Sequence, residues 1–132
     1  SLYRVVPRAV VRPASVAELQ ATLAVARAQR VPVTPRAAGT SLSGQALGPG
    51  VILDLSHHWK GLEVAPDGLS VSVEPGVTGG HVNAVLRPTG RRIGPDPASI
   101  DAAMVGGIVA NDSSGMCCGT AETAYATLDG LE

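Results

Sequence analysis

The chain has 132 residues, of which 45% are hydrophobic and 16% are charged, so it can fold around one hydrophobic core and is too apolar for a disordered tail. Its net charge of −1 and its single Trp, two Tyr and absent Phe argue against a nucleic-acid partner, which needs a basic surface and stacking rings. No apolar run approaches the ~20 residues of a membrane span, and no signal-peptide pattern is present, so a cytoplasmic location is expected.

The first part of the chain predicts a strand, a helix and a second strand. Residues 9–11 predict a short strand, and residues 31–34 predict another. Between them, Ser15 and Glu18 have the spacing of a capping box, which predicts a helix over residues 16–29. Apolar residues recur in this helix at helical spacing and predict one inward stripe: Val16, Leu19, Leu23 and Ala26.

The middle of the chain predicts a buried strand and a hairpin. Residues 51–55 are apolar apart from Asp54, which predicts a strand buried on both faces. Residues 62–65 and 69–73 flank a Pro-Asp-Gly turn and predict a β-hairpin.

Two further helices are predicted after the hairpin. Thr78 is a candidate N-cap for a helix that ends near Leu86 and turns Val82 and Val85 inward. A helix of small residues is expected over residues 101–109. The remaining stretches are rich in Gly, Ser and Pro and predict loops: 35–50, 87–99 and 111–120.

Three glycine-rich turns are the most informative feature of the sequence. They cover residues 36–45, 74–80 and 106–115, and each carries hydroxyl or amide side chains beside its glycines. Glycine lets backbone N–H groups approach a ligand closely, and successive N–H groups form a site for an anion such as a phosphate. Any one turn is explained by tight packing alone, but the three together favour a dinucleotide.

Two common nucleotide-binding motifs are excluded. Gly39 and Gly44 have the spacing of a P-loop, but Gln45 and Ala46 follow instead of the Lys and Ser or Thr that bind phosphate and Mg²⁺. No Gly-x-Gly-x-x-Gly follows a predicted strand and opens a helix, so a Rossmann fingerprint is also missing.

Four segments instead resemble the FAD-linked oxidases, whose fold is named after vanillyl-alcohol oxidase and p-cresol methylhydroxylase (PCMH). Residues 35–45 resemble the first FAD-binding loop of that family, and residues 74–77 resemble its Pro-Gly-Val turn. Residues 94–99 and 106–115 resemble its two later FAD-binding segments. The ending at residues 113–120 is most similar to the branch of D-lactate, glycolate and D-2-hydroxyglutarate dehydrogenases.

The resemblance implies an α+β chain of two small α/β subdomains of the PCMH-type FAD-binding fold. Residues 1–132 would be the N-terminal part of this FAD-binding domain, with its C-terminal part and a cap domain lying outside the sequence. The absence of Met at position 1 also suggests a fragment of a longer polypeptide.

The resemblance also implies FAD bound between the subdomains, without a covalent link, because the first loop lacks the His that carries the flavin in flavinylated relatives. The residues implied around the diphosphate are Pro35, Arg36, Ala37, Ala38, Gly39, Thr40, Ser41, Ser43, Gly44 and Gln45. Those implied on the flavin and diphosphate side are Pro95, Asp96, Ser99, Gly106, Gly107, Asn111 and Ser114, with Gly76 and Val77 at the adenine or ribose.

The implied activity is oxidation of a D-2-hydroxy acid of the lactate or glycolate type, with hydride passing to flavin N5. The partners would be this small acid and an electron acceptor, and some members of the branch carry an iron–sulfur region. No catalytic residue is nominated, because the family's acid–base groups lie largely in the cap domain. One alternative is a module that binds FAD or another nucleotide without catalysis. Another is a packing domain that no longer holds a ligand, since Ala37 and Met104 replace the usual Gly and the frequent Thr.

Other reactive residues have simpler interpretations. His57 and His58 are adjacent and lack a third ligand, and Cys117 and Cys118 lack the spacing of a zinc or iron–sulfur site, so no metal is expected. The two cysteines are expected to be small buried thiols. Arg91 and Arg92 could meet a substrate carboxylate, although a solvent-facing pair is the simpler interpretation.

Overall fold

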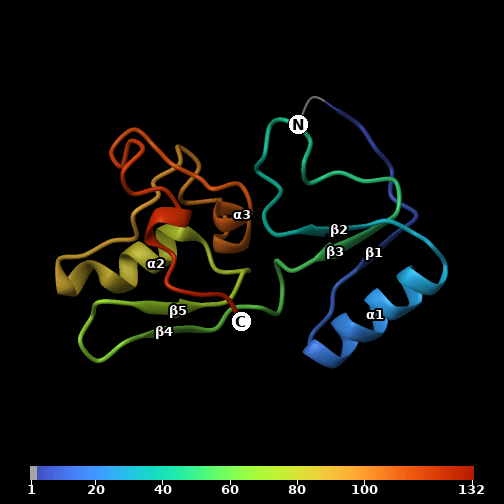
Figure 1. Cartoon of the computed structure of the whole chain (residues 1–132), viewed down its shortest axis with the longest axis horizontal. Coiled ribbons are helices and arrows are strands. Elements are labelled where there is room, and N and C mark those ends of the chain that lie inside the picture. Colours follow the sequence, from blue (N-terminus) through green and yellow to red (C-terminus); the bar gives the residue numbers. More distant parts are fainter. Residues whose placement is uncertain (1–2) are drawn as a thin grey trace.

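The computed structural model describes residues 3–132 as two lobes that lie side by side (Figure 1). The first lobe contains β1 (Ala9–Val11), α1 (Val16–Ala28), β2 (Val33–Arg36) and β3 (Val51–Asp54). The second contains β4 (Leu62–Val64), β5 (Val71–Val73), α2 (Gly79–Leu86), α3 (Val105–Ala110) and the 3₁₀ turns Arg87–Thr89 and Tyr125–Thr127. The predicted α+β class and the division into two small subdomains are confirmed.

The first lobe is a three-stranded parallel sheet with β3 in the centre. The strand order is β1-β3-β2, and Ile52 and Leu53 of β3 are 1% and 2% exposed. A strand paired on both edges and covered on both faces is expected to be continuously apolar, as β3 is before Asp54. Helix α1 begins as predicted, because the Ser15 hydroxyl accepts a hydrogen bond from Glu18 N (3.2 Å) and the Glu18 carboxylate accepts one from Ala14 N (2.7 Å).

The predicted inward stripe of α1 is largely wrong. Ala26 is buried and Leu19 is half-buried, but Val16 and Leu23 are 56% and 42% exposed. Helical spacing shows which residues share a face of α1, but the sheet, whose strands have three or four residues, covers only part of that face. Val85 in α2 is likewise 38% exposed rather than inward, over a hairpin with three-residue strands.

Three elements begin two or more residues later than predicted: β2, β5, which begins at Val71 rather than at residue 69, and α3. Strand β2 begins and ends two residues later than expected, because its ladder with β3 runs from Val33 opposite Val51 to Arg36 opposite Asp54. Pro35 is tolerated within it because β2 is an edge strand. The small-residue helix begins only at Val105, because the residues before it form a tight turn in which two backbone amides donate to the Ser99 carbonyl.

The second lobe packs a hairpin against α2 and holds α3 with a separate cluster. Strands β4 and β5 pair antiparallel as predicted, with Leu62 opposite Val73. Thr78 caps α2 as predicted by accepting a hydrogen bond from His81 N (3.2 Å). The core between hairpin and helix is formed by Val77, Val82 and Leu86. A second cluster holds α3 against the C-terminal segment and consists of Ala103, Ile108 and Ala124.

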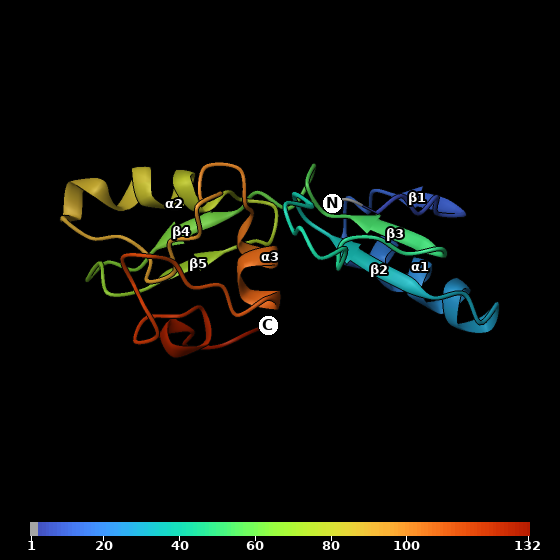
Figure 2. The same ribbon diagram turned by 90° about the horizontal axis from the view of Figure 1, so that it is seen from above.

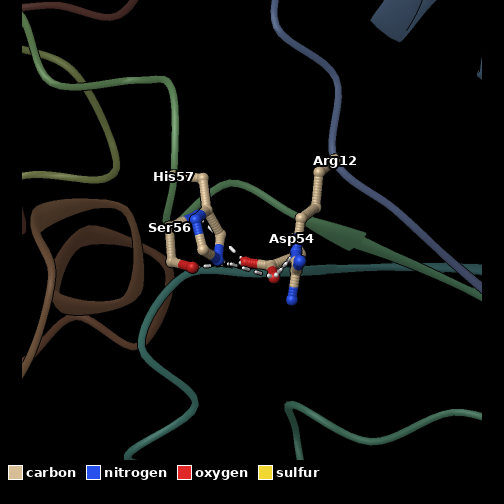
Figure 3. A network of polar contacts seen from close by, with 4 residues as sticks. All are labelled: Arg12, Asp54, Ser56 and His57. Carbon is tan, nitrogen blue, oxygen red and sulfur yellow. Dashed lines mark hydrogen bonds and ion pairs between the residues drawn. The ribbon is translucent and has the colours of Figure 1, made fainter.

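The carboxylate of Asp54, at the end of β3, connects the segment after β1 with the link between the lobes, which is formed by residues 55–61 (Figure 3). It accepts a hydrogen bond from Arg12 Nε, in the segment after β1 (2.9 Å). It also accepts hydrogen bonds from the backbone N (3.0 Å) and the hydroxyl (2.5 Å) of Ser56, in the link. His57 Nε2 lies 3.8 Å away. Burial raises the pKa of Asp54, but the hydrogen bonds from Ser56 and Arg12 outweigh it and lower the pKa from 3.8 to about 2.

A second anchor lies at Trp59, five residues after Asp54. Trp59 Nε1 donates a hydrogen bond to the Pro13 carbonyl (2.9 Å), and Gly76 N donates to the Trp59 carbonyl (2.9 Å). The Lys60 ammonium group donates to the Gly76 carbonyl. The link is therefore bonded to the first lobe on one side and to the segment after β5 on the other. Throughout residues 3–132, every helix falls short of the length and apolarity that crossing a bilayer requires.

We expect Asp54→Asn to lower the free energy of unfolding by about 2 kcal/mol at pH 7, as the lowered pKa of Asp54 implies. A depressed carboxylate pKa stabilises the fold above the unfolded value of 3.8, and this stabilisation is lost as the pH falls towards 2. The difference between wild type and variant should therefore shrink over that range. Urea unfolding followed by Trp59 fluorescence measures it, and Asp129→Asn, at an exposed position, is the control. An equal difference at pH 7 and near pH 2 would contradict the role given to Asp54.

Candidate functional site

A cleft of about 420 Å³ lies between the lobes. In Figure 2, α3 lies on the side of the second lobe that faces the first lobe, opposite the loop that follows β2. The first lobe contributes Pro35, Arg36, Ala37, Ala38, Gly39, Thr40, Ser41, Gln45, Ala46 and Leu55 to the lining. The second lobe contributes Pro75, Pro97, Ser99, Ala103, Met104, Gly106, Gly107, Ile108, Ala110, Asn111 and Ser113. The volume is within the usual range of roughly 300–1,000 Å³ for ligand sites.

The loop after β2 presents backbone donors that the protein itself does not use. Within the described residues, none of the N–H groups from 38 to 45 donates a hydrogen bond to a protein acceptor. Leu47 N closes the end of the loop on the Gly44 carbonyl (3.0 Å), and the Ser41 hydroxyl donates to the Gln45 side chain. The loop is thus held in place while its N–H groups stay available, which suits an anionic ligand.

Gly39 lets this loop fold back over the Arg36 side chain. Its φ of +69° lies in the left-handed region, and a Cβ there would lie 3.1 Å from Arg36 Cδ. The Arg36 guanidinium has no ion-pair or hydrogen-bond partner among residues 3–132. It is also the one charged side chain of the cleft lining, which includes no Asp or Glu. Both the charge and the free N–H groups of this wall therefore favour an anion.

On the opposite wall, the first turn of α3 uses its backbone donors within the protein. Val105 N donates to the Val77 carbonyl (2.8 Å), Gly106 N to the Pro75 carbonyl (3.1 Å), and both Gly107 N and Ile108 N to the Met104 carbonyl. The first turn of α3 therefore has no free N–H to offer. A Cβ at Gly107 would meet nothing within 4 Å, so the helix backbone itself borders open space. This wall suits a flat, largely apolar group.

The two walls together fit FAD, which joins a flat ring system to a doubly charged diphosphate. The free N–H groups of residues 38–41 and 45, which line the cleft, and the Arg36 guanidinium match the diphosphate. The bare backbone at Gly107 and the apolar Met104 and Ile108 match the ring.

The structure brings twelve of the predicted site residues to the cleft. From the first loop these are Pro35, Arg36, Ala37, Ala38, Gly39, Thr40, Ser41 and Gln45. From the second lobe they are Ser99, Gly106, Gly107 and Asn111.

Seven predicted site residues lie outside the lining: Ser43, Gly44, Gly76, Val77, Pro95, Asp96 and Ser114. Several have structural roles in the protein instead. A Cβ at Gly76 would lie 2.5 Å from the Trp59 carbonyl oxygen, and Val77 is 3% exposed in the core. Contact of these seven residues with the cofactor stays a prediction.

Asp96 is engaged by the loop that follows α3. Its carboxylate accepts hydrogen bonds from Cys117 N (3.1 Å) and Cys118 N (3.3 Å). Hydrogen bonds from the Cys117 side chain and from these amides lower the pKa of Asp96. Cys118 is buried as predicted, but Cys117 is exposed.

Nine lining residues were missed in the sequence, and most carry no polar signal. They are Ala46, Leu55, Pro75, Pro97, Ala103, Met104, Ile108, Ala110 and Ser113. Five of them lie within segments that resemble the FAD-linked oxidases, so that resemblance could have identified them: Pro75, Pro97, Ile108, Ala110 and Ser113. Leu55 and Ala46 lie outside those segments, and only the folding of the first lobe brings them to the cleft.

Comparison with known proteins agrees with this geometry. The profile of the FAD binding domain family matches residues 7–132. The chain is 38% identical over 120 residues to glycolate oxidase subunit GlcD of Escherichia coli, covering 89% of this chain and 24% of GlcD. It is 36% identical over 119 residues to D-2-hydroxyglutarate dehydrogenase of the same organism, covering 87% of this chain and 12% of that enzyme. The chain therefore spans a quarter or less of these relatives.

Solved structures share the fold. Xylooligosaccharide oxidase from Myceliophthora thermophila superposes with a TM-score of 0.73 at 22% identity, covering 92% of this chain and 26% of that one. The cofactor of this domain is FAD. The chain belongs to the FAD binding domain family, and its sequence is similar to those of GlcD and D-2-hydroxyglutarate dehydrogenase.

Proposed function

We propose that the chain is the FAD-binding portion of an oxidoreductase that oxidises a D-2-hydroxy acid of the lactate or glycolate type. The observation that carries this proposal is the two-walled cleft, with free backbone donors and Arg36 on one side and a bare, apolar helix face on the other. The names of the two curated relatives support the substrate class, because glycolate and D-2-hydroxyglutarate are both 2-hydroxy acids.

The residues of the cleft divide the work of holding the cofactor. The N–H groups of residues 38–45 and the Arg36 guanidinium would bind the diphosphate, and charge-assisted hydrogen bonds of this kind are the stronger ones. Gly107 leaves room for the ring, and Met104 and Ile108 exclude water beside it. When bound, FAD supplies the acceptor for the hydride that leaves the substrate.

The cleft also supports a non-covalent cofactor. Its lining includes no His, Cys, Tyr, Lys, Asp or Glu, so it offers no side chain of the types that carry a flavin covalently. The same absence means that no lining residue can take the hydroxyl proton of the substrate at neutral pH. In the proposed enzyme, the proton acceptor and the group that binds the substrate carboxylate lie outside the lining residues. The proposal names no molecule as the electron acceptor.

The missing proton acceptor also favours a second candidate function. The chain would then be a module that binds FAD and performs no catalysis alone. The two candidates make the same prediction about FAD binding and differ in what happens when a hydroxy acid is added.

The experiment that separates them uses the purified chain. Added FAD should raise its thermal stability, by about 2.7 kcal/mol when FAD is 100-fold above its dissociation constant. Under anaerobic conditions, D-lactate, glycolate and D-2-hydroxyglutarate are then tested for bleaching of the yellow flavin, with L-lactate as the control. Bleaching by a D-acid supports the enzyme. Because the proton acceptor lies outside the lining residues, the same assay is also run on the full-length protein, and FAD binding there without bleaching by any D-acid supports the module. A chain that gains no stability from FAD contradicts both.

The neighbouring glycines of α3 should respond oppositely to substitution. We expect Gly107→Leu to weaken FAD binding by about tenfold or more, because its side chain would enter the space proposed for the cofactor, at a usual cost of about 1–3 kcal/mol. Its stability without FAD should be unchanged or higher, since a helical Gly costs roughly 0.5–1 kcal/mol relative to Ala. Fluorescence titration with FAD and urea unfolding measure the two effects.

Two matched variants make this test specific. Gly106→Ala should lower stability, because its Cβ would lie 2.6 Å from Pro75 Cβ. Gly130→Leu should leave both properties unchanged, because Gly130 also borders open space but lies away from the cleft. Wild-type FAD affinity in Gly107→Leu would remove α3 from the proposed site.

A further inference from the structure

A second hollow lies at the end of the second lobe, beyond the C-terminus of α2. Its volume is about 440 Å³, and it is lined by Asn83, Arg87, Gly90, Arg91 and Arg92. We call this hollow the arginine pocket. It shares no lining residue with the cleft between the lobes. In Figure 1 this end of α2 is the part of the second lobe most distant from the first lobe.

The arginine pocket carries an uncompensated positive charge. Three of the ten cationic side chains of the protein fall within residues 87–92, although the net charge of the chain is −1. None of the three guanidinium groups has a hydrogen-bond or ion-pair partner in the part of the chain that the structure describes. The turn between β4 and β5 packs near Thr89, but its Asp67 carboxylate accepts a hydrogen bond from Leu69 N (2.9 Å).

Backbone geometry gathers these side chains. Gly90 adopts a φ of +71° and donates its N–H to the Arg87 carbonyl (3.0 Å), which turns the chain at the end of α2. The Asn83 side-chain oxygen accepts a hydrogen bond from Ile93 N (3.0 Å), which holds the returning segment against the helix. Asn83 therefore offers its amide N–H groups to the pocket, and the polar side chains of the lining are all donors.

Helix electrostatics explain only one of the three arginines. Arg87 is the C-cap of α2, where a cation is favoured by the helix dipole. Arg91 and Arg92 lie beyond the helix and have no such role. Their placement around the same hollow as Arg87 therefore has no explanation in the helix itself.

We propose that the arginine pocket binds a phosphate group. A guanidinium presents paired N–H donors that match phosphate oxygens, and three positive charges suit a dianion better than a single carboxylate. The phosphate could belong to a free phosphorylated small molecule or to the headgroup of an anionic phospholipid. Because the pocket lies apart from the cleft, this site is independent of the FAD diphosphate and of the proposed reaction.

The test uses the ¹⁵N-labelled chain and two probes. Sodium phosphate is titrated at constant ionic strength, with sodium acetate as the control for a single negative charge, and the amide signals are followed residue by residue. Vesicles of phosphatidylcholine with phosphatidic acid are compared with vesicles of phosphatidylcholine alone by co-sedimentation. The test variant is Arg91→Gln with Arg92→Gln. The matched control is Arg27→Gln with Arg30→Gln, which removes two exposed arginines at the end of α1.

We expect phosphate to shift the amide signals of residues 83–93, or the acidic vesicles to carry the protein into the pellet. The double variant at Arg91 and Arg92 should weaken that binding by about tenfold or more, the usual effect of losing a charge-assisted hydrogen bond, while the control keeps it. Shifts with phosphate assign a free ligand, and vesicle binding alone assigns a headgroup. The proposal is overturned if neither probe acts at residues 83–93, if acetate acts equally, or if the control variant loses binding to the same extent.

Discussion

The arrangement of the two lobes depends on the carboxylate of Asp54 at the end of the central strand. Arg12 and Ser56 approach it from opposite sides, and the Trp59 indole adds a bond from the link to the segment after β1. The Trp59 carbonyl also accepts a hydrogen bond from Gly76 N, so the same short link is bonded to the segment that leads into α2. The cleft has one wall from each lobe, so its width follows from these contacts.

The two walls are built by different means, and each suits a different part of the cofactor. The loop after β2 leaves the N–H groups of residues 38–45 unused, and it places them beside the unpaired charge of Arg36. Helix α3 has satisfied its own first turn and presents a backbone without a side chain at Gly107. A site with donors on one face and open apolar surface on the other favours a ligand that is charged at one point and flat at another.

The sequence predicted local structure well where a residue acts on its neighbours. The Ser15 and Thr78 caps and the hairpin around residues 66–68 are confirmed because their hydrogen bonds join residues close in sequence. The stripe of α1 was wrong at Val16 and Leu23 because helical spacing shows which residues share a face but not how much of that face another element covers. Twelve predicted site residues reach the cleft, whereas Ala46, Leu55 and Ala103 were missed because apolar residues line a site only through the meeting of distant segments.

Hydrogen–deuterium exchange of the amides in residues 38–45, measured with and without FAD, tests the central claim most directly. Without FAD these N–H groups have no acceptor in the described protein, so they should exchange rapidly. Bound FAD should slow them, while exchange in α1 stays the same. Amides that are already protected without FAD, or that FAD leaves unchanged while it binds, would contradict the account.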